Sequence, residues 1–404
     1  MSRGRTAAVV YGTAAGAGGL GLQAATALAA LAPGAGALHA AGPGRVAGWP
    51  LDPEPPSLVW HAAPRAVPQW RARYTSLRWR HGALQERHDT ALGQWAAGVL
   101  EREGPGAVYA FTQVGLESLR WARAAGVPAV LDSPNGHIAA FRAAYLGEAR
   151  RWCGGVYHGH PTPDMVRRVE EEYALAGRIR VSSPAARESL VEAGVEGARV
   201  AVVPQPLDLG RFVPPPSRAR AGPLRVCFVG TLDLRKGFVY LLRAVRALGA
   251  RVELEMVGST GDRCSRRLFE HEARGMQVRC APGDPLPAYH RAEVMVLPSL
   301  EDGFGFVAAE AMACGLPVVV TREAGASAWV RHGETGWIVP AAREDALAGA
   351  LADALARRGE LTEMGRLARH EVEARGGPAA FAALREWFWR EGAGLGAPDP
   401  PGRQ

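Results

Sequence analysis

The chain has 404 residues, of which 48% are apolar and 22% charged, so it is long enough for two or three domains and is neither a small stapled scaffold nor a disordered chain. Its formal net charge of +7 favours anionic partners, meaning nucleic acid, an anionic membrane or a phosphorylated substrate. The five scattered cysteines show no C-x-x-C and no paired Cys/His spacing. They predict reduced thiols of a cytosolic protein rather than a disulfide framework or a zinc site.

The N-terminal region carries no Asp, Glu, Lys or Arg from residue 6 to residue 44 and predicts a strand, a glycine loop and a helix, Leu20–Leu31. A signal peptide or a membrane anchor is the alternative. The glycine loop has the form G-x-G-x-x-G, which also suggests an NADP site, although the acidic residue expected about 20 positions later is missing. We favour a loop in which Gly18 and Gly19 face a ligand cleft.

Further along, short apolar strands alternate with helical patterns, which predicts an α/β protein with two Rossmann-like, doubly wound parallel sheets facing a central cleft. The expected divisions are an acceptor-side domain at 1–205, a proline-rich linker at 206–222, a nucleotide-binding domain at 223–375 and a final segment at 376–404. The last helix holds three large aromatic residues and is expected to pack back on the body of the protein. The expected strands are Ala7–Tyr11, Ala107–Phe111, Pro128–Asp132, Arg178–Ser182, Val200–Pro204, Leu224–Val229, Val252–Val257, Gln277–Cys280, Glu293–Pro298 and Leu316–Thr321.

The segment from Leu297 to Thr321 carries the strongest chemical signal. A strand is followed by a turn with Gly303 and Gly305 and then by a helix, Phe306–Ala313. The free N–H groups at such a helix start bind phosphate oxygens, and Gly305 allows a ligand to approach the backbone. Two acids, Asp302 and Glu310, stand eight positions apart and can flank one ligand.

This segment resembles the signature of the retaining nucleotide-sugar glycosyltransferases of family 4, which have the GT-B fold. The resemblance implies that Asp302 lies near the donor sugar and that Glu310 holds the donor ribose. Asp302 replaces the glutamate usual at the first position. The expected donor-binding residues from this segment are Gly303, Phe304, Gly305, Phe306 and Glu310.

A second match surrounds Gly230, Arg235 and Lys236 and resembles the turn in which this family grips the donor diphosphate. Lys236 is the only lysine among 47 basic residues, so its presence in an arginine-dominated chain is informative in itself. We expect Arg235 to supply a second cation, because Thr231 stands where relatives place an arginine. His137 follows a strand where relatives present a histidine to the donor sugar, and we assign it, with Lys236 and Asp302, to catalysis.

The expected function is transfer of a sugar from a nucleoside diphosphate to a hydroxyl on a glycan, a lipid-linked or a small-molecule acceptor. The family resemblance implies retention of configuration, and the lack of a D-x-D motif favours a metal-independent reaction. No cofactor is expected, and nucleic acid is not an expected partner because no recognition motif accompanies the positive charge. A noncatalytic scaffold and an NADP-dependent oxidoreductase remain alternatives. The expected location is the cytoplasm, with possible peripheral membrane contact through an aromatic and basic stretch comprising Trp60, Trp70, Arg71, Arg73, Tyr74, Trp79, Arg80 and Arg87.

Overall fold

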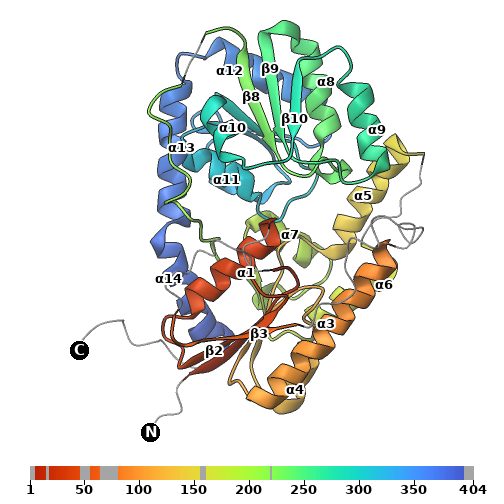
Figure 1. Cartoon of the computed structure of the whole chain (residues 1–404), viewed down its shortest axis with the longest axis vertical. Coiled ribbons are helices and arrows are strands. Elements are labelled where there is room, and N and C mark those ends of the chain that lie inside the picture. The colour runs from red at the N-terminus through yellow and green to blue at the C-terminus, as the bar shows by residue number, and fades with distance from the viewer. Residues whose placement is uncertain are drawn as a thin grey trace.

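The computed structural model describes residues 5–14, 18–45, 55–63, 81–154, 161–218 and 221–394. Two α/β domains lie one after the other along the long axis of the molecule, each with a parallel sheet and flanking helices (Figure 1). Most of the aromatic and basic stretch, from Trp70 to Arg80, lies outside the described residues.

The first sheet has seven parallel strands in the order β3-β2-β1-β4-β5-β6-β7. Its strands are β1 (Thr6–Val10), β2 (Ala37–Gly42), β3 (Leu58–Ala62), β4 (Val108–Phe111), β5 (Ala129–Asp132), β6 (Arg178–Val181) and β7 (Val200–Val202). The helices are α1 (Gly18–Leu31), α3 (His81–Glu103), α4 (Leu116–Ala125), α5 (Ile138–Trp152), α6 (Pro163–Leu175) and α7 (Pro184–Glu192). Continuous burial of β1, β4 and most of β5 agrees with a parallel sheet covered on both faces.

The second sheet has six parallel strands in the order β10-β9-β8-β11-β12-β13. Its strands are β8 (Leu224–Val229), β9 (Val252–Val257), β10 (Val278–Ala281), β11 (Val294–Leu297), β12 (Val318–Thr321) and β13 (Gly336–Val339). The helices are α8 (Phe238–Leu248), α9 (Arg263–Glu272), α10 (Leu286–Arg291), α11 (Phe306–Ala313), α12 (Glu344–Ala356) and α13 (Leu361–Gly376). The predicted fold class is confirmed, because both sheets are parallel and both alternate with helices.

The end of the described chain returns to the first domain. Helix α14 (Pro378–Trp387) and the π-helical turn after it place Phe388 and Trp389, both fully buried, in the same core cluster as the strands β1 and β4. The Phe388 ring meets Tyr109 edge to face at 5.7 Å between centroids. The C-terminal segment therefore contacts both domains, with α13 beside the second sheet and α14 against the first (Figure 1).

A buried arginine holds the chain where it leaves the first sheet. Arg180 on β6 is 1% exposed and donates to the carbonyl oxygens of Val203 and Pro204 and to the amide oxygen of Gln205, at 3.0, 3.2 and 3.0 Å. Its charge is matched by Asp132 at the end of β5, at 3.0 Å. A buried guanidinium is tolerated when it is paired. In the described part of the chain the Nε of Arg180 lacks a hydrogen-bond partner, but its other contacts fix the path of the connection between the two domains.

Helix α1 forms part of the apolar N-terminal region. It is 14 residues long, whereas a helix that spans a bilayer needs about 20 residues. In the part of the chain that the structure describes, no helix has the length and hydrophobicity needed to cross a membrane.

Candidate functional site

The carboxyl ends of the two sheets face each other and meet through their loops. A Cβ on Gly303, after β11, would lie 1.8 Å from the carbonyl oxygen of Pro134, after β5, so only glycine fits this contact. Ser183 Oγ donates to the Gly303 carbonyl at 2.7 Å, and the Gly136 N–H donates to Glu301 Oε1 at 3.1 Å. Ligands of open α/β sheets bind at these carboxyl edges, so the junction between the domains is the candidate site.

The two cations predicted to hold a diphosphate lie in this junction. Lys236 ends a 3-10 turn, and the next residue, Gly237, has φ of 65° and a Cβ position 2.0 Å from the carbonyl oxygen of Pro298. The turn is therefore pressed against the end of β11, which brings Lys236 Nζ into a salt bridge with Asp302. Burial alone would raise the pKa of Asp302, but the charges of Lys236 and Arg235 keep its pKa below the usual value. Lys236 and Asp302, which are both predicted to be catalytic, thus form an ion pair.

Arg235 is held by a different acid that the sequence reasoning missed. Its Nη1 donates to the Glu301 backbone oxygen at 3.0 Å and to the Glu301 carboxylate at 3.3 Å, and its guanidinium lies 5.1 Å from the centre of the Phe141 ring on α5. Burial opposes the charge of Arg235, yet Glu301, Asp302 and Asp233 together raise its pKa. Arg235 therefore stays charged while it contacts both domains.

The start of α11 offers backbone N–H groups to the same junction. Gly305 caps this helix with φ of 85°, and no side chain caps its N-terminus. Phe304 is 1% exposed and packs edge to face against Trp329 and Phe306, at 4.8 and 5.2 Å between centroids. The side chain of Phe304 thus belongs to the core and is not available to a ligand, whereas Phe306 is partly exposed.

Glu310 lies one turn inside α11 and is 8% exposed. The Tyr289 hydroxyl, itself fully buried on α10, donates to Glu310 Oε2 at 2.9 Å. Burial raises the pKa of Glu310 to about 7, although the Tyr289 hydrogen bond and the charge of Arg211 act in the opposite direction. A carboxylate placed in this way is costly to the fold near neutral pH, which is common at ligand sites.

We expect Glu310→Gln to stabilise the free protein at pH 8 but not at pH 4. The folded-state pKa lies above the unfolded value of 4.5, so the wild type loses stability as the pH rises from about 4.5 to about 7, and the glutamine variant does not. The difference should reach the order of 2 to 3 kcal/mol above pH 7. Urea denaturation of both proteins across this pH range checks it, and a difference that does not change with pH would contradict it.

His137 caps the N-terminus of α5 and is 5% exposed. The Ala139 N–H donates to its Nδ1 at 3.3 Å, which assigns the proton of the neutral ring to Nε2. Burial lowers the pKa of His137, although Glu170 raises it. The centre of its ring lies 5.2 Å from the centre of the Tyr173 ring. The preceding residue, Gly136, contacts Glu301 across the junction.

The remaining predicted glycines lie at the same edges. Gly230 follows β8 with φ of 144° and donates its N–H to Val257 at 2.9 Å. Gly18 and Gly19 are the first two residues of α1, which follows β1 in the first domain. Their neighbour Gly16 lies outside the described residues. The structure thus brings Lys236, Asp302 and Arg235 into one cluster and places His137 beside it.

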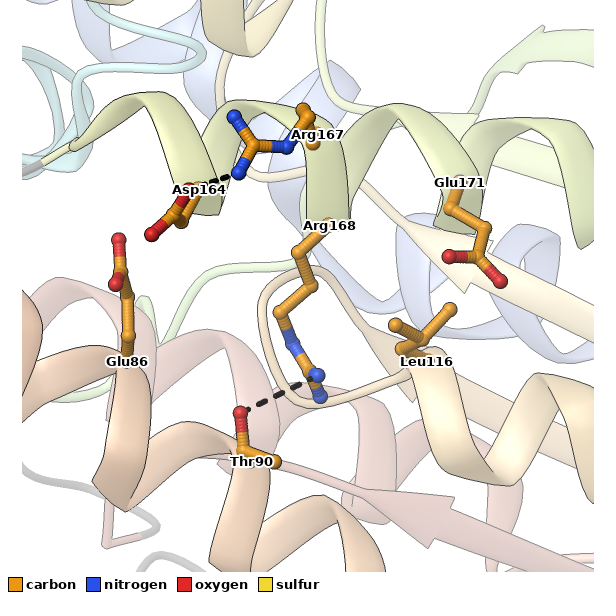
Figure 2. A pocket seen from close by; sticks show the side chains of 7 residues that line it. All are labelled: Glu86, Thr90, Leu116, Asp164, Arg167, Arg168 and Glu171. Carbon is orange, nitrogen blue, oxygen red and sulfur yellow. Dashed lines mark hydrogen bonds and ion pairs between the residues drawn. The ribbon is translucent and has the colours of Figure 1, made fainter.

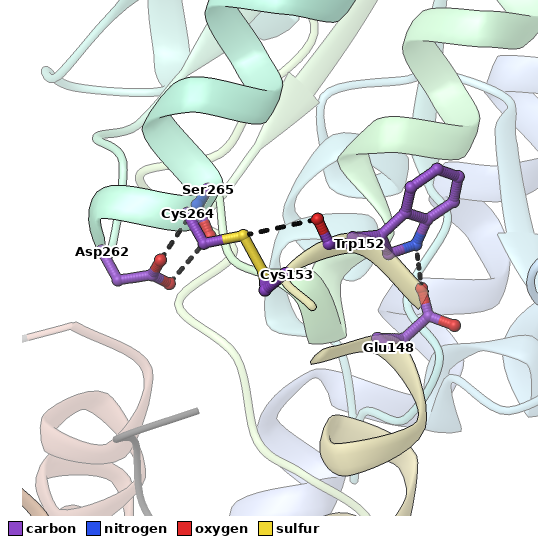
Figure 3. The surroundings of a disulfide bond; sticks show 6 residues. All are labelled: Glu148, Trp152, Cys153, Asp262, Cys264 and Ser265. Carbon is purple, nitrogen blue, oxygen red and sulfur yellow. Dashed lines mark hydrogen bonds between the residues drawn. A yellow bond between two sulfur atoms is a disulfide. The ribbon is translucent and has the colours of Figure 1, made fainter. Parts of the chain in front are cut away.

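The prediction that all five cysteines are free is wrong. Cys153, which caps the C-terminus of α5, forms a disulfide with Cys264 of α9 (Figure 3). Their Cα atoms are 6.0 Å apart although 111 residues separate them in sequence. No local motif could reveal this pair, because the two cysteines meet only where one domain packs on the other. Cys227, Cys280 and Cys314 are free.

The disulfide belongs to a larger contact between α5 and the second domain. The Tyr240 hydroxyl on α8 donates to the Glu148 carboxylate at 2.9 Å, and Trp152 Nε1 donates to the same carboxylate at 2.6 Å (Figure 3 shows Glu148 and Trp152). The Arg243 guanidinium lies 4.5 Å from the centre of the Trp152 ring. Because α5 also carries His137 at its other end, this contact fixes one wall of the junction.

Two hollows open on the first domain beside α6. One, of about 400 Å³, lies between α3, α4 and α6 (Figure 2). Its charges are satisfied within the protein, because Arg168 pairs with Glu117 and Arg167 with Asp164. The lining residues are Glu86, Thr90, Leu116, Asp164, Arg167, Arg168 and Glu171.

The other hollow, of about 440 Å³, lies between α5 and α6 and is more basic. Arg142, Arg150 and Arg167 line it together with small and apolar side chains. Among the described residues, neither Arg142 nor Arg150 has an ion-pair partner, and the buried Nε of Arg142 lacks a hydrogen-bond partner. The unpaired guanidinium groups suit this hollow to an anionic group.

Residues 223–357, which contain Lys236, Asp302 and Glu310, match the family model of the group 1 glycosyl transferases. This match supports the predicted glycosyltransferase family over the second domain. The D-inositol 3-phosphate glycosyltransferase of Paenarthrobacter aurescens is 30% identical over 259 residues, which cover 58% of this chain and 64% of that protein. The GDP-mannose-dependent alpha-(1-6)-phosphatidylinositol monomannoside mannosyltransferase of Mycolicibacterium smegmatis is 32% identical over 212 residues, or 46% and 52% of the two chains.

The chain thus spans between half and two thirds of the length of these two relatives. Solved structures superpose on both domains of this chain. The sucrose-phosphate synthase of Thermosynechococcus elongatus superposes with a TM-score of 0.71 at 21% identity, over 96% of this chain and 99% of that one. Anabaena HepE in complex with UDP and glucose gives a TM-score of 0.69 at 15% identity, over 94% and 97%. The fold is therefore GT-B.

Proposed function

We propose that the protein transfers a sugar from a nucleoside-diphosphate sugar to a hydroxyl acceptor, with retention of configuration and with protein cations at the diphosphate. The observation that carries the proposal is the contact between Lys236 and Asp302 beside the uncapped start of α11. The bond to be broken joins a sugar carbon to a phosphate. As this bond breaks, negative charge develops on the phosphate and positive charge on the sugar. A cation next to a carboxylate can therefore stabilise both.

In this proposal Lys236, Arg235 and the N–H groups at the start of α11 receive the charge that develops on the leaving diphosphate. Such preorganised groups act only where charge develops, so they lower the barrier rather than only tightening binding. Asp302 faces the positive charge of the oxocarbenium-like sugar. The acceptor oxygen bonds to the sugar carbon as the bond to phosphate breaks, and the acceptor proton passes to the departing phosphate on the same face.

His137 and Glu310 position the donor in this scheme. The Nε2–H of neutral His137 can donate to a sugar hydroxyl, and the lowered pKa keeps the ring neutral at pH 7. Glu310 accepts hydrogen bonds from the ribose hydroxyls. Since burial raises the pKa of Glu310 to about 7, donor affinity through this residue should improve as the pH rises through 7 and the carboxylate loses its proton.

We assign the acceptor to the first domain and favour one that carries an anionic group. Arg142 and Arg150 line a hollow on α5, the same helix that His137 begins, and no carboxylate among the described residues neutralises them. The name of one relative specifies D-inositol 3-phosphate, which has both hydroxyl and phosphate groups. A hydroxyl near His137 and a phosphate in the arginine-lined hollow fit such an acceptor.

Thermal-shift measurements with UDP-, GDP- and ADP-linked sugars test the proposal. A donor at 100 times its dissociation constant should stabilise the protein by about 2.7 kcal/mol, and Lys236→Ala should abolish most of this shift. Donor turnover that rises on addition of inositol phosphate would identify the acceptor class. If no nucleotide sugar or nucleoside diphosphate shifts the melting temperature, the proposal is wrong and a noncatalytic scaffold is the better account.

A further inference from the structure

A cluster of metal-binding side chains lies in the first domain, apart from the junction described above. It consists of His39 on β2, His61 on β3 and Glu103, the last residue of α3. In the parallel pairing of β2 with β3, Ala41 lies opposite His61, so His39 and His61 project from the same face of the sheet two residues apart. Helix α3 packs on this face and its end brings Glu103 to the two histidines.

The two histidine nitrogens stand about as far apart as two ligands of one tetrahedral ion, and the Glu103 carboxylate lies somewhat farther away. His39 Nδ1 lies 3.1 Å from His61 Nε2 and 3.8 Å from Glu103 Oε2, and the set of donor atoms lies within 4.8 Å. Two nitrogen ligands of a tetrahedral zinc ion, each at about 2.0 to 2.1 Å, stand about 3.3 Å apart. The two histidine nitrogens therefore already stand close to the separation that zinc needs, whereas Glu103 must move closer to both histidines.

The electrostatic surroundings also suit a cation. Glu103 ends α3, so the cluster lies at the negative end of that helix dipole. The His39 side chain is 9% exposed and that of Glu103 is 34% exposed, which gives one shielded ligand and one that faces solvent.

We propose that His39, His61 and Glu103 bind one zinc ion, with water as the fourth ligand. Two imidazoles and one carboxylate are a frequent zinc ligand set, and each of the three comes from a different element. The ion would tie the edge strand β3 and the end of α3 to β2, with its fourth position open to water. It is separate from the sugar transfer assigned to Lys236 and Asp302.

Metal titration of the full-length protein tests this site. After treatment with a chelator and desalting, calorimetry with Zn²⁺ should show one tight equivalent, and Co²⁺ should give the intense visible absorption of a tetrahedral site. His61→Gln and Glu103→Gln should each weaken the binding by about tenfold or more. These two ligands are more exposed than His39, so their variants are expected to fold, which circular dichroism checks.

His271→Gln is the matched control, because His271 also lies beside a glutamate, Glu272, but with a side chain that is 75% exposed and without a third ligand among the described residues. It should leave zinc affinity unchanged. Cys280→Ser controls for binding through the partly exposed free thiol. The proposal is overturned if no tight equivalent appears, or if zinc affinity survives in His61→Gln and Glu103→Gln or is lost in Cys280→Ser.

Discussion

Replacing Lys236 with alanine is expected to lower kcat/KM for sugar transfer by about 10²- to 10³-fold, the range measured when one electrostatic stabiliser of a transition state is removed. The position of Lys236 in the structure explains why this loss is expected. Lys236 is 16% exposed and its ammonium already touches Asp302, so it does not need to be recruited from solvent. A diphosphate placed there would share this cation with Asp302.

Controls separate this effect from a general loss of stability. Arg358→Ala also removes a partner from a buried carboxylate, that of Glu293, but at the amino end of β11, away from the junction. It should reduce the free energy of unfolding while leaving turnover near normal. Lys236→Arg keeps the charge but not the compact ammonium, and we expect its turnover to stay below that of the wild type. Steady-state kinetics decide the matter, and wild-type turnover in Lys236→Ala would remove Lys236 from the mechanism.

Breaking the Cys153–Cys264 disulfide is expected to lower the free energy of unfolding by about 3 to 5 kcal/mol, because it closes a loop of more than 100 residues in the unfolded chain. The double variant Cys153→Ser/Cys264→Ser should show this loss in urea denaturation, and dithiothreitol should produce the same loss in the wild type but none in the variant. The contacts of Glu148 with Tyr240 and of Arg243 with Trp152 do not depend on the disulfide, so the domains should still pack.

Cys280→Ser serves as the control for the disulfide, since Cys280 is free and partly exposed. Its unfolding curve should respond to dithiothreitol as the wild type does. Thiol titration of the unfolded, non-reduced protein gives an independent check, with three free thiols expected out of five cysteines. Five titratable thiols, or a denaturation midpoint that dithiothreitol leaves unchanged, would show that the bond does not form in solution.

The sequence predicted elements whose signals are local. Strands β8 and β9 and helix α11 have the expected boundaries, because runs of branched apolar residues and flanking glycines act within a few residues. Strands β2 and β3 were missed. β2 consists of alanine, glycine, leucine and histidine, a composition with little intrinsic preference for strands, and it forms because β1 supplies a partner.

The chemistry of the site divides in the same way. The sequence by itself predicted two doubly wound parallel-sheet domains and the loop before α11, and it singled out Lys236, Asp302 and Glu310 as candidate site residues, since each lies within a short motif. Only the tertiary structure decided that Lys236 pairs with Asp302 and that a disulfide joins α5 to α9. It also gathered His39, His61 and Glu103. Such contacts join residues tens to more than a hundred positions apart, and strand order and domain packing determine their geometry, which no local pattern encodes.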